Sequence, residues 1–134
     1  MNKLSGTVTE VISEGQLSLV NVAVAGGVFC SIVVDTPASA PYLRVGGPVH
    51  VLFKENEVVI AKSFAGQISL QNRMDCKIAA IETGKLLCQV TLAFHGSTVV
   101  SLITAQAAIQ MDLKVGDGVT GMVKTNEISL SPND

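Results

Sequence analysis

The chain of 134 residues is 48% hydrophobic and 15% charged, a balance that excludes a disordered segment and supports a packed core. Its net charge of −2 and aromatic content of 4% argue against a general nucleic-acid surface, which needs basic side chains and stacking rings. No apolar run approaches the roughly 20 residues that span a bilayer, and residues 1–6 lack the hydrophobic core of a signal peptide, so we expect a cytoplasmic protein without a membrane partner.

The first half of the chain has the pattern of short strands joined by glycine turns. Alternating or valine-rich runs predict strands at residues 6–12, 17–25, 28–34, 49–53 and 58–61. Pro37 and Pro41 bracket a segment that fits at most one helical turn. The last two strands flank Glu55, Asn56 and Glu57, which predicts a closing hairpin. Asn56 and its counterpart Asn126 are interpreted as turn residues that tolerate a left-handed backbone.

The second half repeats this pattern. Strands are predicted at residues 77–81, 86–93, 98–103, 119–124 and 128–130. Residues 105–111 contain better helix formers than their upstream counterpart and predict a short helix. The connector at residues 62–67 is short, so the two halves should lie close together.

The two halves are copies of one module. Residues 42–58 align with residues 112–128 at an offset of 70, without a gap. The identical pairs are Leu43/Leu113, Val45/Val115, Gly46/Gly116, Val49/Val119, Lys54/Lys124, Asn56/Asn126 and Glu57/Glu127. Self-similarity at a fixed offset marks an internal repeat. We therefore predict an all-β chain of two tandem modules, residues 1–66 and 67–134, each a small five-stranded barrel of the OB type with one short helix.

No catalytic or metal-binding constellation is visible in the sequence. Cys30, Cys76 and Cys88 form no Cys-x-x-Cys pair and are interpreted as buried, reduced thiols rather than zinc ligands. His50 and His95 have no partner ligands at metal spacing. We therefore expect a non-enzymatic protein without a bound metal cation.

The order of the motifs resembles the molybdenum-pterin-binding family, also called Mop or TOBE. A module of that family opens with Ser-Ala-Arg-Asn-x-Leu-x-Gly and continues through a strand ending in Ile-Thr and a short helix. It closes with Leu-x-Leu-x-x-Gly and, further on, a lysine followed by Ala, Ser or Thr. The second module has counterparts at residues 69–76, 103–104, 113–119 and 124–125, and the first at residues 2–6, 43–46 and 54–55. The resemblance covers nearly the whole chain.

This resemblance implies binding of molybdate or tungstate in oligomers of barrels. A tetrahedral oxyanion needs a nearby cation together with hydroxyl and N–H donors. The implied ligand residues are Lys124, Thr125, Ser69, Thr104, Gln71, Asn72 and Lys54, with Lys124 supplying the principal charge. Three plainer roles stay open. Lys124 is also consistent with a solvated hairpin lysine, Ser69 with a hydroxyl bonded to its own backbone, and Thr104 with a cap of the short helix.

Several positions depart from the family pattern, among them Ala107, where many members have serine in the short helix. Gln71 stands where the family has arginine and brings no charge. Glu55 follows Lys54 where the family has Ala, Ser or Thr, and its carboxylate would repel a dianion. Val34 replaces the threonine after the third strand of the first module. We therefore expect sites dominated by the second module to bind more tightly.

The leading functional hypothesis is intracellular storage, homeostasis or delivery of molybdate or tungstate. The alternative is a structural or regulatory interaction module of the same fold that has lost its ligand, while a nucleic-acid binder is disfavoured by the charge. Two small barrels leave apolar faces and strand edges uncovered. With the family resemblance, this predicts a homo-oligomer, first a trimer of two-module chains and alternatively a dimer.

Overall fold

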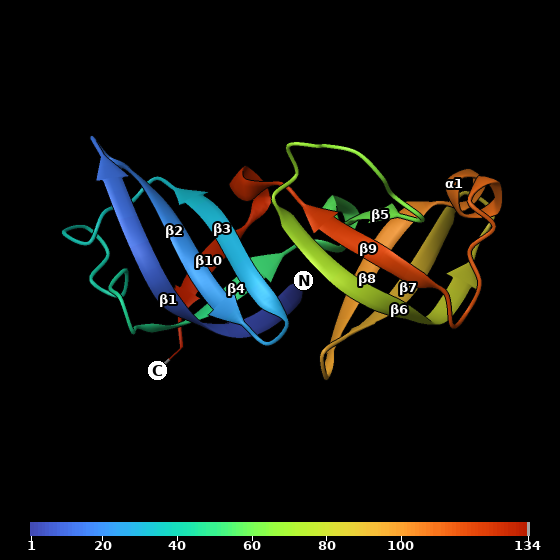
Figure 1. The fold of residues 1–134 in the computed structure, drawn as a ribbon, viewed down its shortest axis with the longest axis horizontal. Helices are drawn as coiled ribbons and strands as arrows, with labels where there is room; N and C mark the ends of the chain where they lie inside the picture. The colour runs from blue at the N-terminus through green and yellow to red at the C-terminus, as the bar shows by residue number, and fades with distance from the viewer. Residues whose placement is uncertain (134) are drawn as a thin grey trace.

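The computed structural model describes residues 1–133 and contains two antiparallel sheets of five strands each, curled into barrels (Figure 1). The first sheet has the order β10-β4-β1-β2-β3, with β1 (Asn2–Glu14), β2 (Leu17–Val24), β3 (Gly27–Val33), β4 (Pro48–Phe53) and β10 (Ser129–Pro132). The second has the order β5-β9-β6-β7-β8, with β5 (Val59–Ala61), β6 (Asn72–Thr83), β7 (Leu87–Phe94), β8 (Ser97–Thr104) and β9 (Gly118–Val123). The predicted all-β fold is confirmed.

The two sheets exchange their closing strands. β5 belongs to the first half of the chain but pairs with β9, with Val59 opposite Met122. β10 belongs to the second half but pairs with β4, with Ser129 opposite Leu52. The predicted closing hairpin between residues 49–53 and 58–61 is therefore wrong. The sequence repeat explains how both exchanges can have the same register, because β4 and β9 offer equivalent edges.

Two short 3-10 turns direct this exchange. η1 (Glu55–Glu57) follows β4, and η2 (Thr125–Glu127) follows β9. The residues before and after each turn have extended backbone, so the chain continues onto the other module instead of reversing. Asn56 and Asn126 lie inside these turns, which agrees with their prediction as turn residues, and neither is among the positive-φ residues of the described chain.

The one α-helix within residues 1–133 is α1 (Ala105–Gln110), in the second module. The corresponding segment of the first module closes one turn, in which the Ala40 amide donates to the Thr36 carbonyl at 2.8 Å. Pro41 follows directly and removes the donor that a further helical bond would require. This agrees with the limit of one turn predicted for that segment.

Four buried polar side chains fasten the modules together in symmetric pairs. The Asn72 side chain donates to the Cys30 carbonyl at 2.9 Å and accepts from the Cys30 amide at 2.7 Å. The Asn2 side chain makes the same two bonds to Val100, each at 2.8 Å. The hydroxyls of Ser31 and Ser101 donate to the carbonyls of Ile128 and Val58, both at 2.8 Å. Each pair is related by the 70-residue offset, so the repeat is expressed as a pseudo-twofold arrangement.

The hydrophobic core runs through both modules as one cluster. Phe29 and Phe53 stack in the first module with ring centroids 6.1 Å apart, and Phe94 is buried in the second. The exchanged strand β5 contributes buried Ile60 to this cluster. The chain thus shares one core between modules that would each be small alone. None of the helices within residues 1–133 has the length and apolar character of a membrane span.

The three cysteines are buried and unpaired, as predicted. Burial raises the pKa of the Cys76 thiol to about 11 and also raises the pKa of Cys30. Because the thiolate is the reactive form, the raised pKa values of Cys30 and Cys76 lower the reactivity of these two thiols at neutral pH.

Candidate functional site

Two equivalent lysines project from the junctions between the modules. Lys54 precedes η1 with φ −81° and ψ 152°, and Lys124 precedes η2 with φ −71° and ψ 145°. Each follows the last buried residue of its strand, so the alternation of the strand leaves the lysine exposed. η1 packs against β8 and η2 packs against β3. Each turn therefore meets a strand of the other module, and any ligand held there is bound by parts of both.

The structure brings four of the predicted site residues to the end of the second sheet where β9 finishes and β6 begins. Asn72 pairs with Val123, which places Gln71 across from Lys124 one residue beyond the last ladder pair. Thr125 follows Lys124 and is half-buried, while Ser69 lies exposed just before Gln71. The Lys124 ammonium and the Gln71 amide thus lie across from each other beside Thr125, and the Ser69 hydroxyl lies in the loop that leads to this end of the sheet. Such groups are donors suited to an oxyanion.

Arg73 is a second positive charge at this end that the sequence analysis did not single out. It lies two residues from Gln71 on β6 and so shares the exposed face of the strand. Its guanidinium donates to the carbonyls of Leu70 and Ile68, both at 3.2 Å, and lies 5.6 Å from the centre of the Phe64 ring. Arg73 therefore holds in place the loop that carries Ser69. The alternation of buried and exposed residues along β6 could have predicted that Arg73 shares the exposed face with Gln71.

Two other predicted site residues lie elsewhere. Asn72 is fully buried, and both polar atoms of its amide are engaged with the Cys30 backbone. Thr104 ends β8, the strand that packs against η1 rather than η2. Its hydroxyl accepts from the Ala107 amide at 3.0 Å, so the alternative role as cap of α1 is confirmed. In Figure 1, α1 lies at the outer end of the second module. Within one chain, the structure does not bring Thr104 together with Lys124.

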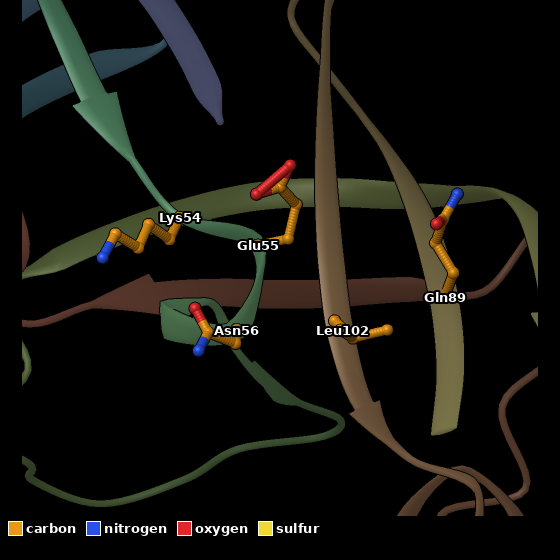
Figure 2. A pocket seen from close by; sticks show the side chains of 5 residues that line it. All are labelled: Lys54, Glu55, Asn56, Gln89 and Leu102. Carbon is orange, nitrogen blue, oxygen red and sulfur yellow. The ribbon is translucent and has the colours of Figure 1, made fainter. Parts of the chain in front are cut away.

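The seventh predicted residue, Lys54, lines the hollow beside η1 (Figure 2). The hollow has a volume of about 370 Å³ and is also lined by Glu55, Asn56, Gln89 and Leu102. The Glu55 carboxylate accepts a hydrogen bond from the Met1 ammonium. This bond lowers the pKa of Glu55, with a smaller contribution from its own backbone amide. The group held by the η1 turn in this structure is therefore a cation.

The strand residues near η2 differ from those near η1. The residues that correspond to Gln89 and Leu102 are Leu19 and Ile32, which face each other on β2 and β3. Ile12 of β1 pairs with Leu19 on the same side and extends the row. The row borders a hollow of about 270 Å³ on the outside of the first sheet. The Glu14 carboxylate also lines this hollow, whereas Lys124 and Thr125 are not among its lining residues.

Comparison with known proteins follows this division into two modules. The family model of the TOBE domain matches residues 1–60 and again residues 68–130. The molybdenum import ATP-binding protein ModC of Mesorhizobium japonicum is 31% identical over 84 residues, which are 62% of this chain and 23% of that protein. The chain thus spans about a quarter of the length of this relative.

One solved structure extends the likeness over nearly the whole chain. A structure of the cytoplasmic molybdate-binding protein ModG with molybdate bound has a TM-score of 0.91 and 25% identity, covering 98% of this chain and 96% of that one. A molybdate-binding protein from Sporomusa ovata is 29% identical, with a TM-score of 0.43, and covers 44% of this chain and 88% of its own. Because the TOBE domain matches both modules and nearly the whole sequence, the chain belongs to the TOBE domain family.

Proposed function

We propose that this protein binds molybdate or tungstate without catalysing a reaction, and that it stores, buffers or delivers the oxyanion in the cytoplasm. The observation that carries the proposal is the placement of Gln71 across from Lys124 and beside Thr125 at one end of the second sheet, with Ser69 two residues before Gln71. The likeness over 98% of the chain to a protein whose structure holds molybdate supports the same ligand class.

In this proposal Lys124 supplies the main positive charge, and Thr125, Ser69 and Gln71 donate hydrogen bonds to the oxygens. Asn72 fixes the wall of the site by holding β3 against β6. The ends of these side chains are exposed, so an anion bound to one chain alone would stay hydrated. The site therefore suits a ligand that a second chain covers. Thr104 would reach such a site only from another chain, since it lies on the strand beside η1.

We further propose that chains assemble into a homo-oligomer, most simply a trimer, with a dimer as the alternative. The row of Ile12, Leu19 and Ile32 beside η2 motivates this, since Ile12 is 55% exposed and Ile32 36% exposed. A second copy that covers this row would also close the anion site. Light scattering at micromolar concentration tests the assembly, and a stable monomer would contradict it.

The alternative function is an interaction module of the same fold that has lost its ligand. Gln71 in place of the family's arginine and Glu55 beside Lys54 favour this alternative. Elemental analysis of the purified protein separates the two, because only a working site retains molybdenum or tungsten. Neither function calls for a nucleic-acid partner.

Calorimetric titration with molybdate, tungstate and sulfate tests the proposed site. We expect the two larger oxyanions to bind and sulfate to bind much more weakly. Lys124→Ala removes a charge-assisted hydrogen bond of about 1.5–3 kcal/mol and should weaken binding by about tenfold or more. The control is Lys114→Ala, because Lys114 is an exposed lysine paired with Asp112. If Lys124→Ala binds like the wild type while Lys54→Ala abolishes binding, the site has been assigned to the wrong turn.

A further inference from the structure

The turns η1 and η2 have the same backbone and nearly the same residues. Lys54 and Asn56 correspond to Lys124 and Asn126, and both turns end in a glutamate. The position between the lysine and the asparagine differs, with Glu55 in η1 and Thr125 in η2. A hydroxyl has thus been exchanged for a carboxylate at one point of an otherwise equivalent turn.

The surroundings of Glu55 have changed with it. Asn2 pairs with Phe53, so Met1 lies across from Lys54 as Gln71 lies across from Lys124. The Met1 ammonium and the Glu55 carboxylate form an ion pair. In Figure 2 the Glu55 carboxylate and the Gln89 amide both extend upward, whereas Lys54 and Asn56 extend to the opposite side from Gln89.

Charge then decides what such a site can hold. A doubly charged oxyanion placed at η1 would meet a carboxylate where η2 offers a hydroxyl donor, and like charges at contact repel strongly in a partly desolvated hollow. The ammonium held by Glu55 has the opposite sign to the ligand proposed for η2. Because both turns have this lysine, the lysine does not determine whether a turn prefers an anion or a cation.

We propose that Glu55 reverses the charge preference of the η1 site, so that this turn excludes oxyanions. The inference rests on the proposed oxyanion binding at η2 and deepens it. Two equivalent turns then give one class of oxyanion site in the wild-type protein.

Calorimetric titration of the full chain with molybdate tests the inference. Glu55→Thr makes η1 a copy of η2 and should add a second set of molybdate sites, so that the bound molybdate per chain roughly doubles. Glu55→Gln removes the charge at nearly constant size and should also add these sites. The double variant Glu55→Thr with Lys54→Ala should lose the added sites again.

The matched control is Glu57→Gln. Glu57 lies on the same turn, where its carboxylate accepts a hydrogen bond from the Lys54 amide at 2.9 Å. Because η2 has the equivalent Glu127, this carboxylate does not distinguish the turns, and its neutralisation should add no sites. Thermal unfolding of each variant verifies that the fold is kept.

The outcomes separate this inference from the proposed function. If the wild type binds molybdate and neither Glu55 variant gains sites, the charge reversal is wrong while the proposed function stands. If Glu55→Thr gains sites and Glu55→Gln does not, the missing hydroxyl rather than the charge closes η1, which also overturns the inference. If the wild type binds no molybdate but both Glu55 variants do, the inference holds and the proposed site at η2 fails. Absence of binding in every variant overturns both.

Discussion

Single buried amides connect the two modules at the residue scale. β3 and β6 belong to different sheets and share no backbone ladder. The Asn72 side chain connects them with two hydrogen bonds to the backbone of Cys30. This side chain is fully buried, so water cannot substitute for the bonds if the amide is removed. The family motif that contains Asn72 implies a ligand residue, but its side chain is fully buried and both of its polar atoms bond the Cys30 backbone.

Asn72→Ala should destabilise the protein by about 1–3 kcal/mol or more, because the buried amide and carbonyl of Cys30 both lose their partner. Urea unfolding measures the loss. Asn21→Ala is the control, since the Asn21 amide bonds the Glu10 carboxylate on the surface and its loss should change stability by no more than about 0.5 kcal/mol. Equal effects of the two variants would show that the Asn72 bonds contribute nothing beyond those of a surface pair.

The residue types proposed for the site were predictable from the sequence, and their grouping was predictable in part. Gln71 lies across from Lys124 because β6 and β9 are antiparallel neighbours, which the repeat and strand pattern imply. Thr104 was grouped with them because it belongs to the same module, yet it lies on the strand beside η1. Sequence distance within a module does not predict spatial distance when the modules interlock.

The exchanged strands decide the architecture at the scale of the element. Nearly all strand positions were predictable, because valine-rich alternation and glycine turns mark them locally. The partner of β5 was not, because the repeat gives β4 and β9 the same pattern and hence the same edge. The backbone is extended on both sides of η1, so the chain does not fold back into a hairpin there. It continues to the other sheet, where β5 pairs with β9.

The exchanged strand β5 is fixed at its end by a polar anchor. Lys62 follows β5 and donates to the carbonyls of Met111 and Asp112 at 3.2 and 2.9 Å. Its ammonium also lies 3.1 Å from the Asp117 carboxylate. That carboxylate accepts from the Lys114 amide at 2.9 Å. These contacts tie the start of the connector to the loop between α1 and β9.

Asp117 makes this anchor dependent on pH. The hydrogen bond from the Lys114 amide, followed by that from Lys62, lowers the pKa of Asp117 below its ordinary value of 3.8. A carboxyl with a lowered pKa in the folded state stabilises above its unfolded pKa, and the contribution is lost as pH falls through the folded pKa. Asp117→Asn should therefore be less stable than wild type at pH 7, and the difference should shrink below pH 3.8.

Urea unfolding at neutral and acidic pH measures this change, with Asp75→Asn as the control because Asp75 is an exposed carboxylate on β6. A difference between Asp117→Asn and wild type that stays constant from neutral to acidic pH would show that the carboxylate charge does not hold the anchor.

The whole molecule is one folding unit although its sequence contains two modules. One hydrophobic cluster includes residues of both, and each sheet obtains its closing strand from the other half of the chain. A fragment of residues 1–66 would keep β5 without the β9 edge that pairs with it, and would lack the β10 strand that covers β4. A fragment of residues 67–134 has the complementary defect.

We therefore expect neither fragment to fold as a monomer, because each exposes an unpaired strand edge and part of the shared core. Mixed in equal amounts, the two fragments should recover the circular dichroism spectrum and the cooperative unfolding of the intact chain. The control is the full chain cleaved at a protease site inserted near Gly66, in the exposed connector, which should stay associated after the cut. Size-exclusion chromatography with thermal unfolding makes the measurement. A monomeric fragment of residues 1–66 with its own cooperative transition would show that the strand exchange is not needed for folding.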